Sequence, residues 1–152
     1  MKTLILGLGN PILSDDSVRF RVIQGLRAEF SRPDLTLMET SISGLGLLDL
    51  ITGYDKVIII DAIKTEGGQA GKIYRLSAEN LSDTRHSASP HDINLATALE
   101  LGKKLGIALP QQIIIFAIEV VDVTNFSERC TPEVEKAIPL AVSMVAEELD
   151  RD

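Results

Sequence analysis

The sequence predicts an α/β protein built as a three-layer sandwich, with helices on both faces of one sheet. Short apolar runs of strand length alternate along the chain with segments whose apolar residues recur at helical spacing. The clearest run, Lys56–Ile63 (KVIIIDAI), is rich in β-branched residues, which is typical of a strand covered on both faces. The 152 residues contain no repeat, low-complexity segment or linker, so we expect a single domain, residues 1–152.

The first part of the chain predicts a strand, a helix and a second strand. Lys2–Leu6 is a short apolar run that stops at a glycine turn. Ser17–Phe30 then carries apolar residues at helical spacing, with Ser14 or Asp15 as its cap. The strand Leu35–Glu39 follows, and we expect it at an edge of the sheet.

The connection between the third and fourth predicted strands is too short for a helical crossover. Only Lys64–Ala70 separates Lys56–Ile63 from Gly71–Leu76, so the fourth strand should run antiparallel to the third. The remaining predicted elements are a short helix at Gly44–Ile51, a helix from His91 to Leu105 preceded by Pro90, a strand at Gln112–Ile118, and a last helix that Thr131-Pro132-Glu133 opens, with Thr131 as cap, and that reaches Leu149.

The charge balance and the cysteine content exclude several classes of protein. The net charge is −7 and basic residues occur only as isolated pairs such as Lys103-Lys104, so nucleic acid is not expected as a partner. Apolar runs such as Ile113–Ile118 are much shorter than the roughly 20 residues of a membrane helix, so no membrane is expected either. Cys130 is the single cysteine, which fits a reducing compartment. We therefore expect a cytoplasmic protein, and a monomer, although the sequence leaves the oligomeric state open.

Two carboxylates and one imidazole are expected to meet at the carboxyl edge of the sheet. Asp15 and Asp16 follow the first strand; one acid is enough to cap a helix, which leaves the other at the sheet edge, and we expect Asp16 to face the same crevice as Asp61. Asp61 lies near the end of the third strand, where a buried carboxylate is costly unless it is paired. His91 begins a helix, where the dipole favours a neutral, ligating imidazole. Capping for the acids and a surface position for the histidine are the ordinary alternatives; together the three residues suit zinc or nickel.

Other motifs point to chemistry that the chain does not complete. GLGNPI shares two glycines with a dinucleotide-binding turn, but Ile12 stands where the third glycine belongs. The same start is similar to that of peptidyl-tRNA hydrolases, which place a catalytic histidine soon after the turn, whereas the first histidine here is His86. His86 lies in a polar loop and is the lesser metal candidate. Cys130 has no histidine nearby, which indicates a structural role.

Five short motifs together give the chain a specific resemblance. They are GLGN at Gly7–Asn10, DD at Asp15-Asp16, DA at Asp61-Ala62, SPH at Ser89–His91 and TPEVE at Thr131–Glu135. In this order and spacing, the chain resembles the hydrogenase maturation endopeptidases, which remove the carboxyl-terminal extension of the nickel–iron hydrogenase large subunit. The resemblance implies a mostly parallel, five-stranded sheet whose fourth strand is antiparallel.

The same resemblance implies how the site works. Asp16, Asp61 and His91 would contact a nickel ion that the substrate already carries, and would supply part of its coordination shell. Such a metal polarises the scissile carbonyl and activates water, or else Asp16 or Asp61 acts as the base, so the enzyme is an aspartic or metal-dependent endopeptidase. The partner is then the hydrogenase large-subunit precursor, and no organic cofactor is expected.

Two stretches depart from the family pattern. Ser17-Val18-Arg19 follows the acidic pair, where the family commonly has a glycine-containing helix start. A Gly-Thr-x-Gly element associated with substrate recognition reads Ser-Ile-Ser-Gly here; this assigns substrate binding to Ser41, Ile42 and Gly44 and leaves the substrate open. Two alternatives follow: a non-catalytic metal-binding or chaperone-like domain with the same fold, and a small nucleotide-binding or hydrolase domain that shares only the first turn.

Overall fold

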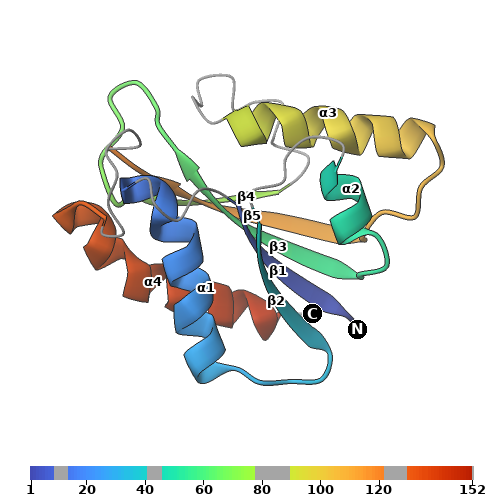
Figure 1. The fold of residues 1–152 in the computed structure, drawn as a ribbon, viewed down its shortest axis with the longest axis horizontal. Helices are drawn as coiled ribbons and strands as arrows, with labels where there is room; N and C mark the ends of the chain where they lie inside the picture. Colours follow the sequence, from blue (N-terminus) through green and yellow to red (C-terminus); the bar gives the residue numbers. More distant parts are fainter. Residues whose placement is uncertain (9–13, 41–45, 78–89, 122–129, 152) are drawn as a thin grey trace.

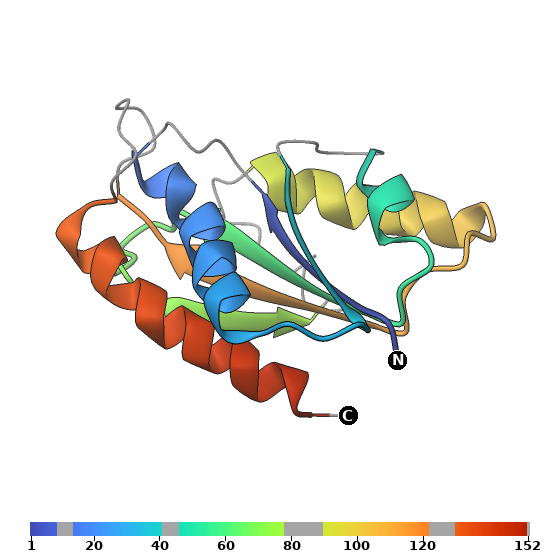
Figure 2. The same cartoon turned by 60° about the horizontal axis from the view of Figure 1, so that its bottom comes forward.

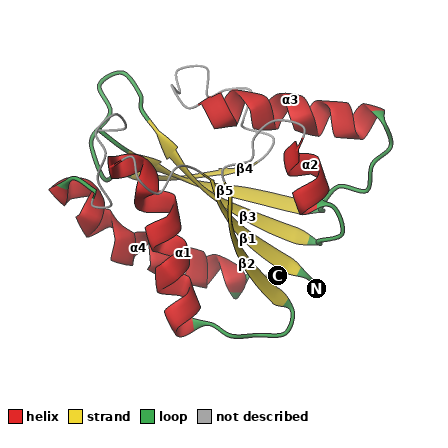
Figure 3. Cartoon of the chain, in the orientation of Figure 1, coloured by secondary structure: helices red, strands yellow, loops and turns green. Residues whose placement is uncertain are grey.

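Two layers of helices enclose a five-stranded sheet in the computed structural model of the chain (Figure 1). The structure describes residues 1–8, 14–40, 46–77, 90–121 and 130–151, and for Ser14, Asp16 and residues 90–96 it describes the backbone alone. Strands and helices alternate as the sequence predicts (Figure 3). In chain order the elements are β1 (Thr3–Leu8), the 3-10 helix η1 (Ser14–Ser17), α1 (Val18–Glu29), β2 (Leu35–Thr40), α2 (Gly46–Ile51), β3 (Lys56–Ile63), β4 (Ile73–Ser77), α3 (Pro90–Lys104), β5 (Gln112–Glu119) and α4 (Pro132–Leu149).

The strands lie in the order β2-β1-β3-β5-β4, and β4 alone runs antiparallel to its neighbour in this sheet. The edge position of β2 and the direction of β4 are both confirmed. The neighbour of β4 is nevertheless β5 and not β3, with Tyr74 opposite Ala117. The short β3–β4 connection therefore reverses the chain without forming a hairpin, because β5 later pairs with both strands.

The boundary between β1 and β3 is a topological switch point. The chain leaves β1 toward β2 on one side and leaves β3 toward β4 and β5 on the other. In open α/β sheets, ligands usually bind in the crevice outside the carboxyl ends of such strands. The pairing of the two strands runs from Thr3 opposite Lys56 to Gly7 opposite Ile60. Asp61 is therefore the first residue of β3 beyond that pairing.

Helices α1 and α4 cover one face of the sheet, and α2 and α3 cover the other (Figure 2). Alternate residues of β3 enter the two cores, with Ile58 and Ile60 in the first and Val57 and Ile59 in the second. All of β3 is buried, which confirms a strand covered on both faces. Within the described part of the chain, no helix has the length and apolar character needed to cross a bilayer.

The close approach of α1 to β1 depends on Gly7. A Cβ atom here would lie 2.9 Å from Ile23 Cγ1 and 3.0 Å from the backbone oxygen of Arg19, both on α1. The sequence predicts Gly7 in a turn, but the strand continues through it to Leu8. Its lack of a side chain therefore brings the first turns of α1 directly against the carboxyl end of β1.

Candidate functional site

The candidate site lies at the carboxyl ends of β1 and β3. Asp61 is near the end of β3, Asp16 belongs to η1, which follows β1, and His91 is the second residue of α3. Figure 1 shows that η1 and the beginning of α3 lie toward the same end of the sheet as these strand ends. The elements that carry the three predicted residues thus lie toward one edge of the sheet, and the meeting of their side chains stays a prediction.

The carboxylate of Asp61 is buried, with 1% of the residue exposed, and it forms an ion pair. Arg19 donates from Nη1 to Oδ1 at 2.6 Å, and the backbone N–H of Ala62 donates to the same oxygen at 2.8 Å. Both hydrogen bonds that described residues donate to the Asp61 carboxylate therefore end on Oδ1. The partner is equally buried, because the Arg19 side chain is 2% exposed.

The partnership of Arg19 with Asp61 was not anticipated from the sequence. Arg19 lies in the first turn of α1, one helical turn before Ile23, which is fully buried. An arginine on the buried stripe of an amphipathic helix needs an acidic partner inside the protein, because an unpaired buried charge is costly. That pattern was the available signal. It indicates that an acidic partner exists, although it does not say which one.

Asp15 is fully buried and joins three segments of the chain. Its Oδ2 accepts from the backbone N–H of Val121 at 2.9 Å, and its Oδ1 accepts from the backbone N–H of Thr131 at 2.6 Å. The Thr131 hydroxyl lies 3.0 Å from both carboxylate oxygens. Asp15 thus ties η1 to the segment after β5 and to the start of α4.

The N-cap position of α1 is Ser17, so the cap predicted at Ser14 or Asp15 is wrong. The Ser17 side chain makes no capping hydrogen bond. Asp15 instead binds the N-cap residue of α4, Thr131, whose position is as predicted but whose side chain makes no cap bond within its own helix. The short η1 turn allows this, because it carries the acidic pair ahead of α1.

Several predicted residues stay predictions. The side chains of Asp16 and His91, and all of Ser41, Ile42 and Gly44, lie outside what the structure describes. Among the side chains that it does describe, no three His, Cys, Asp or Glu residues are grouped so as to hold a metal ion. Asp61 is therefore the one member of the predicted set whose surroundings can be stated from the described residues.

Two other buried polar groups near this edge have structural roles. Glu119, at the end of β5, accepts hydrogen bonds from the backbone N–H and the hydroxyl of Thr65, and so holds the β3–β4 connection. Cys130 is buried, with its Sγ 3.6 Å from the Ser17 hydroxyl. Burial raises the pKa of this thiol above its usual value, so Cys130 is not an activated nucleophile. This agrees with the structural role predicted from the sequence.

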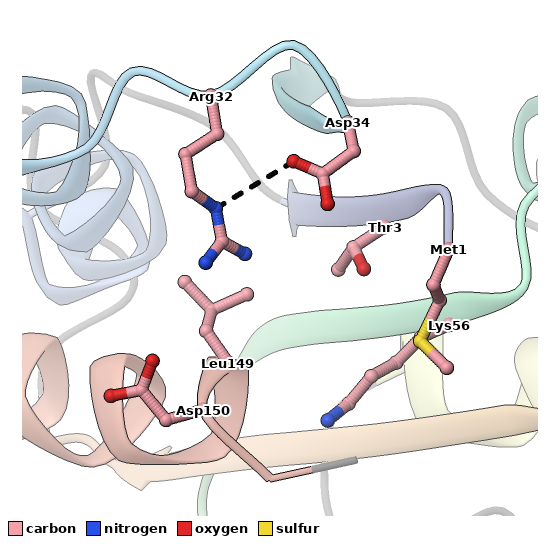
Figure 4. A pocket seen from close by; sticks show the side chains of 7 residues that line it. All are labelled: Met1, Thr3, Arg32, Asp34, Lys56, Leu149 and Asp150. Atoms are coloured by element: carbon pink, nitrogen blue, oxygen red, sulfur yellow. Dashed lines mark ion pairs between the residues drawn. The ribbon is translucent and has the colours of Figure 1, made fainter.

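A pocket of about 340 Å³ lies at the opposite, amino-terminal edge of the sheet (Figure 4). Its cationic side chains are already paired. Lys56 donates from Nζ to the backbone oxygens of Glu148 and Arg151 at 2.7 and 3.0 Å, and Arg32 pairs with Asp34 at 3.7 Å. We therefore assign this pocket no part in the reaction.

The carboxylate of Glu148 anchors α4 beside this pocket. It receives two hydrogen bonds from Arg75 of β4, at 2.9 and 3.0 Å, and lies 3.5 Å from Lys56 Nζ. The hydrogen bonds from Arg75 hold the pKa of Glu148 below its usual value, and the charge of Lys56 adds to this effect against the cost of burial.

Comparison with known proteins identifies the family. The family model HycI, described as hydrogenase maturation protease, matches residues 20–148. The chain belongs to the hydrogenase maturation protease family. The matched range contains Asp61 and His91 and begins after Asp15, Asp16 and Arg19.

Relatives of this hydrogenase maturation protease match it along nearly its whole length. The hydrogenase 2 maturation protease of Escherichia coli is 26% identical over 147 residues, which cover 95% of this chain and 88% of that protein. The structure of the hydrogenase maturating endopeptidase HybD from E. coli superposes with a TM-score of 0.85 at 25% identity, covering 98% of this chain and 92% of that one. The hydrogenase 2 maturation peptidase of a Thaumarchaeota archaeon gives a TM-score of 0.70 at 25% identity, covering 100% of each chain.

These likenesses confirm the predicted family and fold. As a hydrogenase maturation protease, the protein is a hydrolase, and proteases of this family process the carboxyl terminus of a hydrogenase large subunit. The mixed five-stranded sheet with its antiparallel strand matches the fold of HybD.

Proposed function

We propose that this protease removes the carboxyl-terminal extension of a nickel–iron hydrogenase large-subunit precursor after nickel insertion, and that Asp16, Asp61 and His91 contact the nickel carried by that substrate. The observation that supports this best is the buried carboxylate of Asp61 at the switch point. Described donors bind it only through Oδ1, so Oδ2 is the oxygen left for a ligand.

The donor set suits the ion. Carboxylate oxygen and neutral imidazole are both acceptable ligands for nickel, and three protein ligands leave the other positions to the substrate and to water. When present, the metal polarises the scissile carbonyl and activates water. The chain's own contribution is orientation, because Arg19 and the Ala62 N–H together fix the plane of the Asp61 carboxylate.

Peptide hydrolysis also requires proton transfers. Water adds to the carbonyl carbon while a base takes one of its protons, and the C–N bond then breaks as the leaving amine gains a proton. Asp16 and Asp61 are the two groups to which we assign this exchange, because a positioned carboxylate can accept a proton and return it. We place the reaction in the cytoplasm, since the single, buried Cys130 fits a reducing compartment.

Cleavage of a purified, nickel-loaded precursor tests the proposal, with the loss of the extension followed by mass spectrometry. Asp16→Ala and His91→Ala should each lower the rate by about 100-fold or more, and the precursor without nickel should stay uncut. Arg21→Met is the matched control, because Arg21 pairs with Glu135 of α4, and this variant should cut at the wild-type rate.

Each other outcome has a definite meaning. Unchanged cleavage by Asp16→Ala would remove Asp16 from the site. Cutting of the nickel-free precursor at the full rate would overturn the role of the metal. Tight binding of the loaded precursor without cleavage by the wild-type protein would overturn the proposal in favour of a non-catalytic, chaperone-like domain with the same fold.

A further inference from the structure

We propose that Arg19 is an internal counter-cation that weakens the binding of free divalent metal ions at Asp61. The site would then accept nickel when the substrate presents it with other ligands, and would bind the free ion poorly. This inference deepens the proposed function and rests on it, because it takes Asp61 as a metal contact.

Arg19 is held in place by the packing of α1 on β1, and its side chain is not a flexible one at the surface. Its residue is 1% exposed, and its backbone oxygen lies where a Cβ on Gly7 would come within 3.0 Å, so the first turn of α1 sits directly on β1. From there Nη1 reaches Oδ1 of Asp61 at 2.6 Å, a short and charge-assisted hydrogen bond. The guanidinium therefore stands at the switch point as part of the fold.

The cation and a metal ion would share one carboxylate. A first-row metal binds a carboxylate oxygen at about 2.0–2.2 Å, so an ion on Oδ2 would lie within a few ångströms of the guanidinium that holds Oδ1. Arginine stays charged at every pH that a protein survives, and it cannot relieve the repulsion by losing a proton. Repulsion between close charges is strong where water is excluded, and both side chains are 2% exposed.

The pair also neutralises the carboxylate without a metal. A buried carboxylate without a partner is costly, and binding a cation or a proton relieves that cost. Because Arg19 already neutralises the Asp61 carboxylate, this driving force for metal binding is absent. A free ion must therefore bind through Oδ2 against a fixed positive charge, whereas a substrate can add ligands and contact area of its own.

Calorimetric titration with nickel chloride, on the full-length protein without precursor, tests the inference. Arg19→Met keeps the length of the side chain and removes the charge, and should bind nickel at least tenfold more tightly than the wild type. Arg21→Met, on the same helix but paired with Glu135, should bind like the wild type. The double variant Arg19→Met/Asp61→Asn should lose the gain. Nickel should also raise the unfolding midpoint of Arg19→Met by more than that of the wild type.

Loss of a buried cation can impair folding, so two further variants keep the test decisive. Arg19→Gln is polar and neutral and should repeat the gain in affinity, whereas Arg19→Lys keeps the charge and should stay near the wild type. Neutral variants with native circular dichroism that bind nickel no more tightly than the wild type overturn the inference, whether their binding is weak or absent. So does a gain that survives in the double variant.

The outcome is independent of catalysis. If Arg19→Met binds nickel more tightly but the precursor is never cut, the proposed function is refuted. The role of Arg19 in weakening metal binding at Asp61 would still stand. Normal nickel-dependent cleavage alongside an unchanged affinity would refute the role of Arg19 alone.

Discussion

Replacing Asp15 with asparagine should separate the architectural acid of the pair from the one assigned to the metal. The carboxylate accepts from the backbone N–H of Val121 through Oδ2 and from the backbone N–H of Thr131 through Oδ1, with the threonine hydroxyl near both. An asparagine side chain has one oxygen, so one of the two backbone donors must face its amino group.

The cost follows from that geometry. The variant loses one hydrogen bond to a charged group, worth about 1.5–3 kcal/mol, and leaves a donor without an acceptor at a fully buried position, where the penalty is about 1–3 kcal/mol. These two numbers describe overlapping effects, so we expect Asp15→Asn to lower the free energy of unfolding by about 3 kcal/mol. That is a large share of the roughly 5–15 kcal/mol typical of a domain.

Urea denaturation followed by circular dichroism at 222 nm measures this loss. The matched variant Thr131→Val removes the hydroxyl but keeps the backbone N–H, and should cost about 1 kcal/mol. In the Asp15→Asn background the same substitution should cost less, since the two changes act on one cluster. A loss below 1 kcal/mol for Asp15→Asn, with an unchanged dependence on urea, would refute the assignment of this residue as an anchor.

Two further predictions concern stability away from the site. Gly71 has φ 86° and a Cβ there would lie 2.6 Å from the backbone oxygen of Glu133, whereas Gly67 has φ 71° and open space. Thermal unfolding should therefore show Gly71→Ala costing about 2–4 kcal/mol and Gly67→Ala only about 1–2, and equal losses would contradict the contact with α4. The pairing with Arg75 lowers the pKa of Glu148. The contribution of the ionised Glu148 to the free energy of unfolding is therefore complete above the unfolded pKa of about 4.3, and it is lost as the pH falls through the folded pKa. Glu148→Gln should therefore lose less stability than the wild type as the pH falls below about 4.3; parallel pH profiles would contradict this.

The strands and helices were predictable because each has a strong local signal. β3 matches the predicted Lys56–Ile63 without change, and α4 begins at the Thr131-Pro132 signal and ends at the predicted Leu149. The neighbour of β4 was not predictable from the short connection, because pairing is decided by where β5 returns. Local sequence sets the direction of a strand, while its partner depends on the whole sheet.

The same distinction between local sequence signals and long-range contacts applies to the candidate site. That Asp61 would come to the edge beside β1 followed from one strand pattern and the neighbourhood of the first and third strands. The partners of Asp15 and Asp61 did not follow, because Asp15 binds residues 106 and 116 positions away and Asp61 pairs with a residue 42 positions before it. No periodicity in the sequence encodes such contacts; only the packed structure determines them.

The long reach of Asp15 has a consequence for how the protein matures. Its partners lie after β5 and at the start of α4, so the turn that carries the acidic pair cannot be anchored while those later segments are still being synthesised. Contacts of such high sequence separation form late and slow the folding of a domain. A growing chain can therefore complete the anchor of the acidic pair only after Thr131, at the start of the last helix, has been synthesised.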